Sequence, residues 1–247
     1  MMNTIPDNKL KKINYYWQDI LDYTTHDKSY TSQVTSDHKL NQSNKVSIYH
    51  INKRSFLKVD PLLYDEVNKF IESYYSYKNV NADCFINEYG DNVSNIVTNY
   101  IYYLSESTLI HDIYDSSYTI RALTFSDKEL FENFKHNCSK EDFEKVKIEL
   151  SAPLVLGCFH NNNLIAVASL LYTKNNIADI KLITLKNYRK KGTGKLLCKS
   201  ICLSGLSKNK ILQFKFSKSD VALKRIAELL GFKLYVIEES FMLNLKK

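Results

Sequence analysis

The order of apolar and polar positions predicts a chain that mixes helices with strands. Between residues 10 and 21, apolar and aromatic side chains recur every three or four positions, which is the period of a helix with one buried face. A polar run from 24 to 45 has no period and predicts a long loop. The stretches VSIYHI (46–51) and SFLKV (55–59) then predict two short strands.

Two more helices are predicted before residue 118. Pro61 follows Asp60, an order that is typical of a helix start with an acidic cap. A further helix is predicted from Val93 to Leu104. We therefore expect residues 1–117 to form a smaller α+β amino-terminal domain, in which no catalytic motif is recognisable.

From residue 118 onward the predicted elements alternate more regularly. Their order is a strand at 118–123, helices beginning at Asp127 and Lys140 (the second capped by Ser139 and reaching Leu150), hairpin strands at 153–160 and 164–173, a strand at 177–185, a helix that carries Leu196 to Leu206, a strand at 211–216, a helix at 219–231 stopped by Gly231, and a strand at 240–245. We expect these residues, 118–247, to form a second domain.

Composition places the 247-residue chain among soluble globular proteins. The hydrophobic fraction is 44% and the charged fraction 25%, and no apolar run approaches the roughly 18 to 20 residues that a membrane-spanning helix needs. The opening residues, MMNTIPDNKLKKINYYW, lack the apolar core of a secretory signal. We therefore expect a cytoplasmic protein with no membrane partner.

The five cysteines give no sign of a disulfide framework or of a metal site. They lie at 84, 138, 158, 198 and 202, without a CxxC pair. Cys198 and Cys202 are four apart and would share a helix face, which is half of a metal site, but no histidine or acid lies near them in sequence. We expect small buried side chains in a reducing compartment and no metal.

Charge is distributed unevenly along the chain. Residues 1–117 hold 11 Lys and Arg against 15 Asp and Glu, a balance of −4, whereas the remainder holds 23 against 12, a balance of +11. Between Lys181 and Arg225 there are 13 basic residues and one acid, Asp220. This segment indicates a partner with several negative charges, and phosphates are the obvious candidates.

The most basic stretch, NYRKKGTGK (187–195), lies where a predicted strand meets a predicted helix. It is no Walker A loop, because Arg189 and Leu196 stand where that motif needs glycine and Ser or Thr. It is no dinucleotide fingerprint, because Leu197 replaces the third glycine. Gly192 and Gly194 still let backbone N–H groups converge beside a helix N-terminus, which is a nest for a pyrophosphate. The alternative is a solvated basic turn.

The arrangement Arg-x-x-Gly-x-Gly, preceded by the strand DIKLIT (179–184) and followed by AELLGF (227–232), resembles the acetyl-CoA-binding core of the GNAT superfamily of N-acetyltransferases. The resemblance covers residues 118–247 and implies an α/β (α+β) fold with a mixed central sheet flanked by helices. Residues 1–117 resemble the degenerate, half-GNAT-like leading domain of one subgroup.

The resemblance also implies site residues. In this superfamily the strand before the motif splays from its neighbour and binds the pantetheine arm and the acetyl carbonyl, a role that falls here to Leu182, Ile183 and Thr184. The pyrophosphate would lie on the loop, whose residues are Arg189, Lys190, Lys191, Gly192, Thr193, Gly194 and Lys195.

Two further positions matter for the chemistry that the resemblance implies. Asp179 is the acid of the motif strand and the candidate general base; its alternative is a structural aspartate that faces solvent or pairs with Lys181. On the later helix the superfamily often has an Asn that contacts the cofactor and a Tyr that protonates the leaving thiolate, where this chain has Asp220 and Ala227.

These observations predict an acetyl-CoA-dependent N-acetyltransferase that moves an acetyl group directly to a primary amine, with a small molecule or a protein as acceptor. One alternative is a non-catalytic CoA-binding regulatory module, which the departures at Asp220 and Ala227 suggest. A second is a nucleic-acid-binding protein that uses the basic cluster, and a third is a protein lysine or N-terminal acetyltransferase. The segments 20–45 and 136–152, where acceptor loops lie in this fold, carry no chemical signature, so the acceptor and the oligomeric state stay open.

Overall fold

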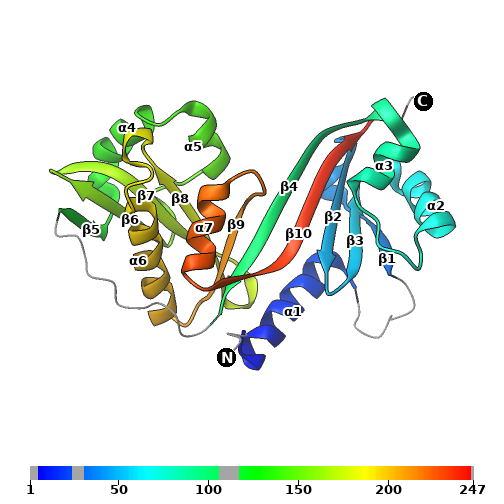
Figure 1. Cartoon of the computed structure of the whole chain (residues 1–247), viewed down its shortest axis with the longest axis horizontal. Helices are drawn as coiled ribbons and strands as arrows, with labels where there is room; N and C mark the ends of the chain where they lie inside the picture. Colours follow the sequence, from blue (N-terminus) through cyan, green and yellow to red (C-terminus); the bar gives the residue numbers. More distant parts are fainter. Residues whose placement is uncertain (1–4, 24–30, 106–116, 246–247) are drawn as a thin grey trace. The chain divides into compact units, whose positions relative to one another are not determined.

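The structure is a computed structural model that describes residues 5–23, 31–105 and 117–245 (Figure 1). Residues 24–30, which are part of the polar run predicted as a loop, lie outside the described residues. Among the helices within these three ranges, none has the length and apolar character to cross a membrane.

The chain groups into two compact units, each made of three stretches that are separated in the sequence. The motif unit holds 1–12, 102–215 and 221–233, and the amino-terminal unit holds 13–101, 216–220 and 234–247. These units group residues by their contacts in space, and the domain division expected from the sequence, 1–117 and 118–247, stays a prediction.

The amino-terminal unit is built on a sheet with the strand order β1-β3-β2-β10-β4. β1 runs parallel to β3, whereas β2 is antiparallel to both β3 and β10. Its elements are α1 (Asp7–Leu21, whose first turns group with the motif unit), β1 (Ser32–Ser36), β2 (Lys45–Ile51), β3 (Arg54–Val59), α2 (Tyr64–Tyr74), α3 (Ala82–Tyr89), β4 (Val93–Leu104) and β10 (Phe232–Leu243).

One apolar core joins the sheet of this unit to α2 and α3. Val46, Ile48 and Leu57 of the strands pack with Phe70 of α2 and Phe85 of α3. The predicted helix start near Pro61 is present as a 3-10 turn, Pro61–Leu63, in which the Asp60 carboxylate accepts from Leu62 N–H, and α2 begins directly after it.

Three predictions for the strands of this sheet were wrong in detail. Residues Val93–Leu104 form the strand β4 and not a helix, because their β-branched and aromatic side chains suit a sheet. The predicted loop at 24–45 contains the short strand β1, which pairs with β3. The last strand begins at Phe232, eight residues before the expected start.

The motif unit has a sheet with the order β9-β8-β7-β6-β5, antiparallel except where β8 meets β9. This confirms a mixed sheet flanked by helices. The elements are β5 (Tyr118–Ala122), α4 (Lys128–His136), α5 (Lys140–Val146), β6 (Leu154–His160), β7 (Asn163–Tyr172), β8 (Ile177–Thr184), α6 (Thr193–Ser207), β9 (Ile211–Ser217) and α7 (Val221–Leu229) (Figure 1).

Helices cover both faces of this sheet. α4 packs on the face that carries Val167 and Ile183, which are paired across β7 and β8. α6 packs on the opposite face, where Gly205 approaches Leu170 and Leu212. α5 begins behind the predicted Ser139 cap but ends at Val146, because Lys147 adopts left-handed backbone angles, with φ of 50°.

Candidate functional site

The strand β8 is paired fully on one side and only partly on the other. Its pairing with β7 extends from Ala178 to Thr184, whereas its parallel pairing with β9 extends only from Ile177 to Ile180. Within the described strands, the last four residues of β8 therefore have no ladder partner on the β9 side. Such an edge offers backbone N–H and C=O groups to an extended ligand.

The three residues predicted to bind the cofactor arm lie on this unpaired part of β8. Leu182 and Thr184 face α6, since both side chains lie within 4 Å of the position that a Cβ on Gly194 would take. Ile183 points to the other face and belongs to the core beneath α4. These three side chains therefore pack against neighbouring elements, and the strand edge presents backbone N–H and C=O groups to a ligand.

Two glycines shape the loop between β8 and α6. Gly192 has φ of 81° and ψ of −14°, a left-handed conformation that disfavours any side chain, and it is the N-cap of α6. Gly194 lies in the first turn of α6, where an added Cβ would come within 3.3 Å of the Ile226 side chain and 3.5 Å of the Thr184 hydroxyl. The first glycine is needed for its backbone angles and the second for close packing.

The N-cap residue of α6, Gly192, has no side chain with which to cap the helix. The first helical hydrogen bond is donated by Leu196 N–H to Gly192 C=O, at 3.0 Å, so the amides of Thr193 and Gly194 have no acceptor within the helix. Thr193 is 1% exposed, and its hydroxyl has no hydrogen-bond partner among the described residues. The loop therefore ends in orphan donors and the positive end of a helix dipole.

The cations of the loop differ in what they contact. Arg189 Nε donates to Thr184 C=O at 3.0 Å, and its Nη2 donates to the Asp142 carboxylate of α5 at 2.8 Å. Lys191 Nζ lies 5.3 Å from the centre of the Tyr188 ring, and Lys190 has φ of 62° and is exposed. Arg189 therefore anchors the loop to β8 and α5, while the two lysines reach solvent.

Hydrogen bonds from Ser139 and from the Arg189 guanidinium lower the pKa of the Asp142 carboxyl. A carboxylate so held is ionised at neutral pH, and the ion pair weakens only when the pH falls through this lowered pKa. The anchor of the loop is consequently intact throughout the physiological range.

Asp179, the candidate base, lies in a polar network inside the motif unit. It is 8% exposed, and one of its oxygens accepts from Lys181 Nζ at 2.7 Å. Its other oxygen lies 3.5 Å from the amide nitrogen of Gln213, and Gln213 accepts a hydrogen bond from the Tyr103 hydroxyl at 2.5 Å. The pairing with Lys181 considered from the sequence is therefore present, and a role as base stays a prediction.

The two departures on the later helix are placed differently. Asp220 immediately precedes α7, its N–H donates to Ser217 C=O at 2.9 Å, and it groups with the amino-terminal unit. It is thus not brought together with the loop inside one unit, and its part in cofactor binding stays a prediction. Ala227 is fully buried on α7 and presents no polar group.

The cysteine pair of α6 is part of the core. Cys198 and Cys202 are both fully buried, and burial together with a hydrogen bond to Cys198 raises the pKa of the Cys202 thiol. The described parts of the chain contain no cluster of three or more His, Cys, Asp and Glu side chains suited to a metal ion.

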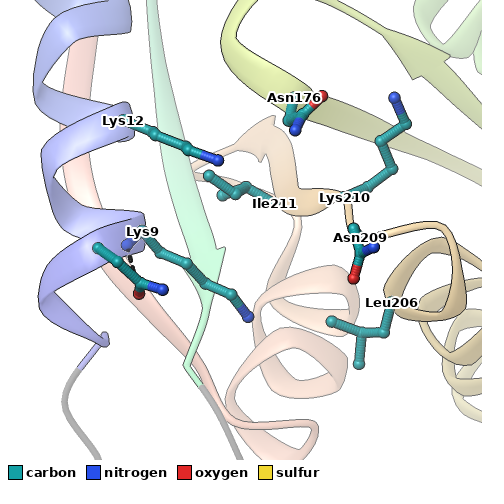
Figure 2. A pocket seen from close by; sticks show the side chains of 8 residues that line it. Lys9, Lys12, Asn176, Leu206, Asn209, Lys210 and Ile211 are labelled. Carbon is teal, nitrogen blue, oxygen red and sulfur yellow. Dashed lines mark hydrogen bonds between the residues drawn. The ribbon is translucent and has the colours of Figure 1, made fainter.

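A separate cavity of about 620 Å³ lies in the motif unit at the other end of α6 (Figure 2). α6 has 15 residues and is therefore roughly 22 Å long, so this cavity is well separated from the loop at the helix N-terminus. Its lining is basic and amide-rich, from Asn8, Lys9, Lys12, Asn176, Leu206, Asn209, Lys210 and Ile211.

The sequence alone locates the loop and Asp179, but not the residues that contact them. Asp142 lies 47 positions before Arg189, and Gln213 lies 34 positions after Asp179. No local pattern announces such pairs, because the fold alone brings them together. β8 and β9 pair with Asp179 opposite Gln213, so that contact could be predicted only once this strand pairing was known.

Comparison with known proteins adds structural likeness and no sequence relative. No protein-family profile and no curated protein matches the chain. A GNAT-family acetyltransferase from Colwellia psychrerythraea aligns with a TM-score of 0.52 and 12% identity, over 94% of this chain and 97% of that chain. A GCN5-related N-acetyltransferase from Sphaerobacter thermophilus aligns with a TM-score of 0.50 and 10% identity, over 65% of this chain and 55% of that chain.

A conserved protein of unknown function from Staphylococcus epidermidis aligns with a TM-score of 0.50 and 11% identity, over 73% of this chain and 81% of that chain. At identities this low, structural likeness establishes the fold. The protein has the fold of the GNAT acetyltransferases, and the Colwellia alignment takes in most of both units.

Proposed function

We propose that the protein is an N-acetyltransferase that binds acetyl-CoA and transfers the acetyl group directly to a primary amine in the cytoplasm. The single observation that carries the proposal is the combination of an unpaired β8 edge with a glycine loop that opens onto the N-terminus of α6. The fold likeness supports it, because the same strand, loop and helix are the elements that the GNAT resemblance assigns to the cofactor.

The residues fit the two polar parts of coenzyme A. The orphan amides of Thr193 and Gly194, with the exposed Lys190 and Lys191, suit a pyrophosphate. The backbone of Leu182 to Thr184 suits the amide-bearing pantetheine arm, because an extended chain can pair with a free strand edge. Bound acetyl-CoA would supply the activated acyl group.

The protein would contribute mainly by positioning. Holding an amine beside a thioester converts a bimolecular reaction into an effectively unimolecular one. Backbone donors of β8 would stabilise the developing oxyanion, and Asp179 is the candidate acceptor for the ammonium proton. Because Ala227 offers no proton, we expect water to protonate the leaving thiolate.

A second candidate is a CoA-binding protein without transferase activity. Two observations favour it: Asp179 is already paired with Lys181, and Ala227 is buried. This candidate shares the predicted cofactor site with the first and differs in chemistry alone. Within the transferase proposal, protein lysines and N-termini are acceptors to be compared with small amines.

The test measures thiol release from acetyl-CoA by the full chain with a panel of small amines, a lysine-containing peptide and a peptide with a free N-terminus. We expect amine-dependent release with at least one acceptor and its loss in Gly192→Glu, which strains the backbone and puts an anion in the loop. Gly90→Glu is the matched control, because Gly90 also has positive φ and open space around its Cβ position.

Activity should survive in Gly90→Glu. Binding of acetyl-CoA without thiol release from any acceptor would favour the non-catalytic candidate. Release that persists in Gly192→Glu would refute the assignment of the loop.

A further inference from the structure

The amino-terminal unit contains a pocket of its own, which the proposed acetyl transfer does not use. It has a volume of about 340 Å³, at the lower end of the roughly 300 to 1,000 Å³ typical of small-molecule sites. Its lining comes from β2, β3, β4, β10, the turn between β2 and β3, and two loops: His50, Lys53, Arg54, Asn79, Val80, Asn81, Thr98, Tyr100, Lys218, Ile237 and Glu239.

A hydrogen-bonded chain fixes one wall of this pocket. His50 lies between Ser55 and Glu239, with its Nδ1 3.2 Å from the Ser55 hydroxyl and its Nε2 3.2 Å from a Glu239 oxygen. Ser55 is fully buried and donates to Val80 C=O at 3.1 Å. The same Glu239 oxygen accepts from Ala82 N–H at 2.9 Å, so the chain links β2, β3, β10 and the start of α3.

The carboxylate of this chain is already engaged by protein donors. Burial opposes the ionisation of Glu239, but the hydrogen bonds from His50 and from the Ala82 amide outweigh it and hold the pKa of the carboxyl below its ordinary value. Among the described residues that line this pocket, Glu239 is the one carboxylate. Three basic side chains, Lys53, Arg54 and Lys218, share this lining with it, so the described lining has an excess of basic groups.

Arg54 is the least exposed of these three basic residues. Its guanidinium carbon lies 5.0 Å from the centre of the Phe56 ring, and Phe56 in turn stacks on Tyr23 with the ring centres 4.2 Å apart. Arg54 Nε is buried and has no hydrogen-bond partner within the described part of the chain. A buried N–H of a charged group without an acceptor is costly, so packing against Phe56, and not a hydrogen bond from Nε, holds this side chain at the pocket. The guanidinium has four further N–H donors, on its two terminal nitrogens, that an anionic ligand in the pocket could engage.

We propose that this pocket is a second binding site, for a small organic anion whose carboxylate or phosphate group is held by Arg54 and Lys218. The guanidinium suits either group, because its donors match two oxygens at once. The amides of Asn79 and Asn81 and the hydroxyl of Thr98 would read the polar remainder of the ligand. The proposal concerns the amino-terminal unit and does not depend on acetyl transfer.

The test titrates the full chain with inorganic phosphate and with succinate by calorimetry at low ionic strength. We expect saturable binding of at least one anion, weakened at least tenfold by Arg54→Gln. Lys69→Gln is the matched control, because Lys69 is an exposed cation of α2 in the same unit but outside the pocket. Its affinity should stay within twofold of the wild-type value.

Lys218→Gln provides a second variant in case Arg54→Gln perturbs folding. Because Lys218 is exposed, its replacement should weaken binding of the anion severalfold without unfolding the chain. The titrations are repeated in Gly192→Glu, which disables the motif loop as a competing anion site; retained binding there supports the pocket. The proposal is overturned if neither anion binds saturably, if Gly192→Glu abolishes binding, or if the pocket variants behave like Lys69→Gln.

Discussion

Gly192 and Gly194 are needed for different physical reasons, although they are only two residues apart. Gly192 turns the chain with φ of 81°, and nothing lies within 4 Å of a Cβ at this position. Gly194 has ordinary angles, and a side chain there would press on Ile226 and Thr184. A bulky residue at 192 therefore strains the loop, whereas one at 194 pushes α6 away from β8.

Asp179 illustrates how a buried carboxylate can serve two roles. Its contact with Lys181 and its proximity to Gln213 tie the side chain into the interior of the motif unit. The same contacts would also hold a catalytic base in one orientation. Structure and catalysis make different predictions for Asp179 and its partner, and mutation separates them.

We predict that Asp179→Asn lowers kcat by about 100-fold or more while the Kd for acetyl-CoA changes less than threefold, as expected for loss of a general base. Lys181→Gln removes the same ion pair but leaves the carboxylate, so its kcat should fall much less. Steady-state kinetics with calorimetry measure both quantities. Equal losses of kcat in the two variants would show that Asp179 acts only through the ion pair.

Between elements, the contact that bears most directly on the loop is that of Arg189 with α5. The Arg189–Asp142 pair is partly exposed, with side chains 44% and 37% accessible, so its worth is about 1 kcal/mol or less. Its value lies in position, since the second hydrogen bond of Arg189, to Thr184 C=O, ties the same side chain to the end of β8.

We predict that Asp142→Asn binds acetyl-CoA up to about fivefold more weakly than Glu141→Gln, because the loop loses its anchor. Glu141→Gln is the control, since it removes one negative charge and one exposed ion pair, with Lys145, from the same helical turn, while the pair of Arg189 with Asp142 is kept. Calorimetry near neutral pH, where the lowered pKa of Asp142 keeps the pair charged, measures the difference. Tighter binding by Asp142→Asn would mean that Asp142 withholds Arg189 from the ligand.

Elements with strong local signals could be predicted from the sequence, and those defined by distant partners could not. The hairpin β6–β7 and the strand β8 carry long apolar runs between asparagine turns, and they lie where the pattern placed them. β1 has Val34 as its one apolar residue, and it is a strand because β3 pairs with it. Residues 93–104 were assigned the helical period although Ile96, Val97 and Tyr100 favour a strand.

At the scale of the whole molecule, several of the basic side chains contact acidic or aromatic side chains of the same chain. Of the 13 cations between Lys181 and Arg225, Lys181 pairs with Asp179, Arg189 with Asp142, and Lys224 with Glu228. Lys210 lies over the Tyr172 ring at 4.1 Å. These contacts weaken the case for a nucleic-acid surface, which needs cations directed outward to phosphates.

The two candidate sites differ in how far the sequence could reveal them. The loop at 187–195 is contiguous, so its glycines and cations appear together in the chain. The amino-terminal pocket draws His50, Arg54, Thr98, Lys218 and Glu239 from separate segments. Such a site becomes visible only when β10, which comes last in the chain, is paired with β2, which comes early.

The most direct measurement of the central claim is calorimetric titration of the full chain with acetyl-CoA, beside Gly192→Glu and the matched control Gly90→Glu. We predict saturable binding with a Kd below about 1 mM, in the range usual for enzyme substrates, with binding retained in Gly90→Glu and lost in Gly192→Glu. Absence of binding to the folded wild-type protein, or equal binding by Gly192→Glu, would contradict the account.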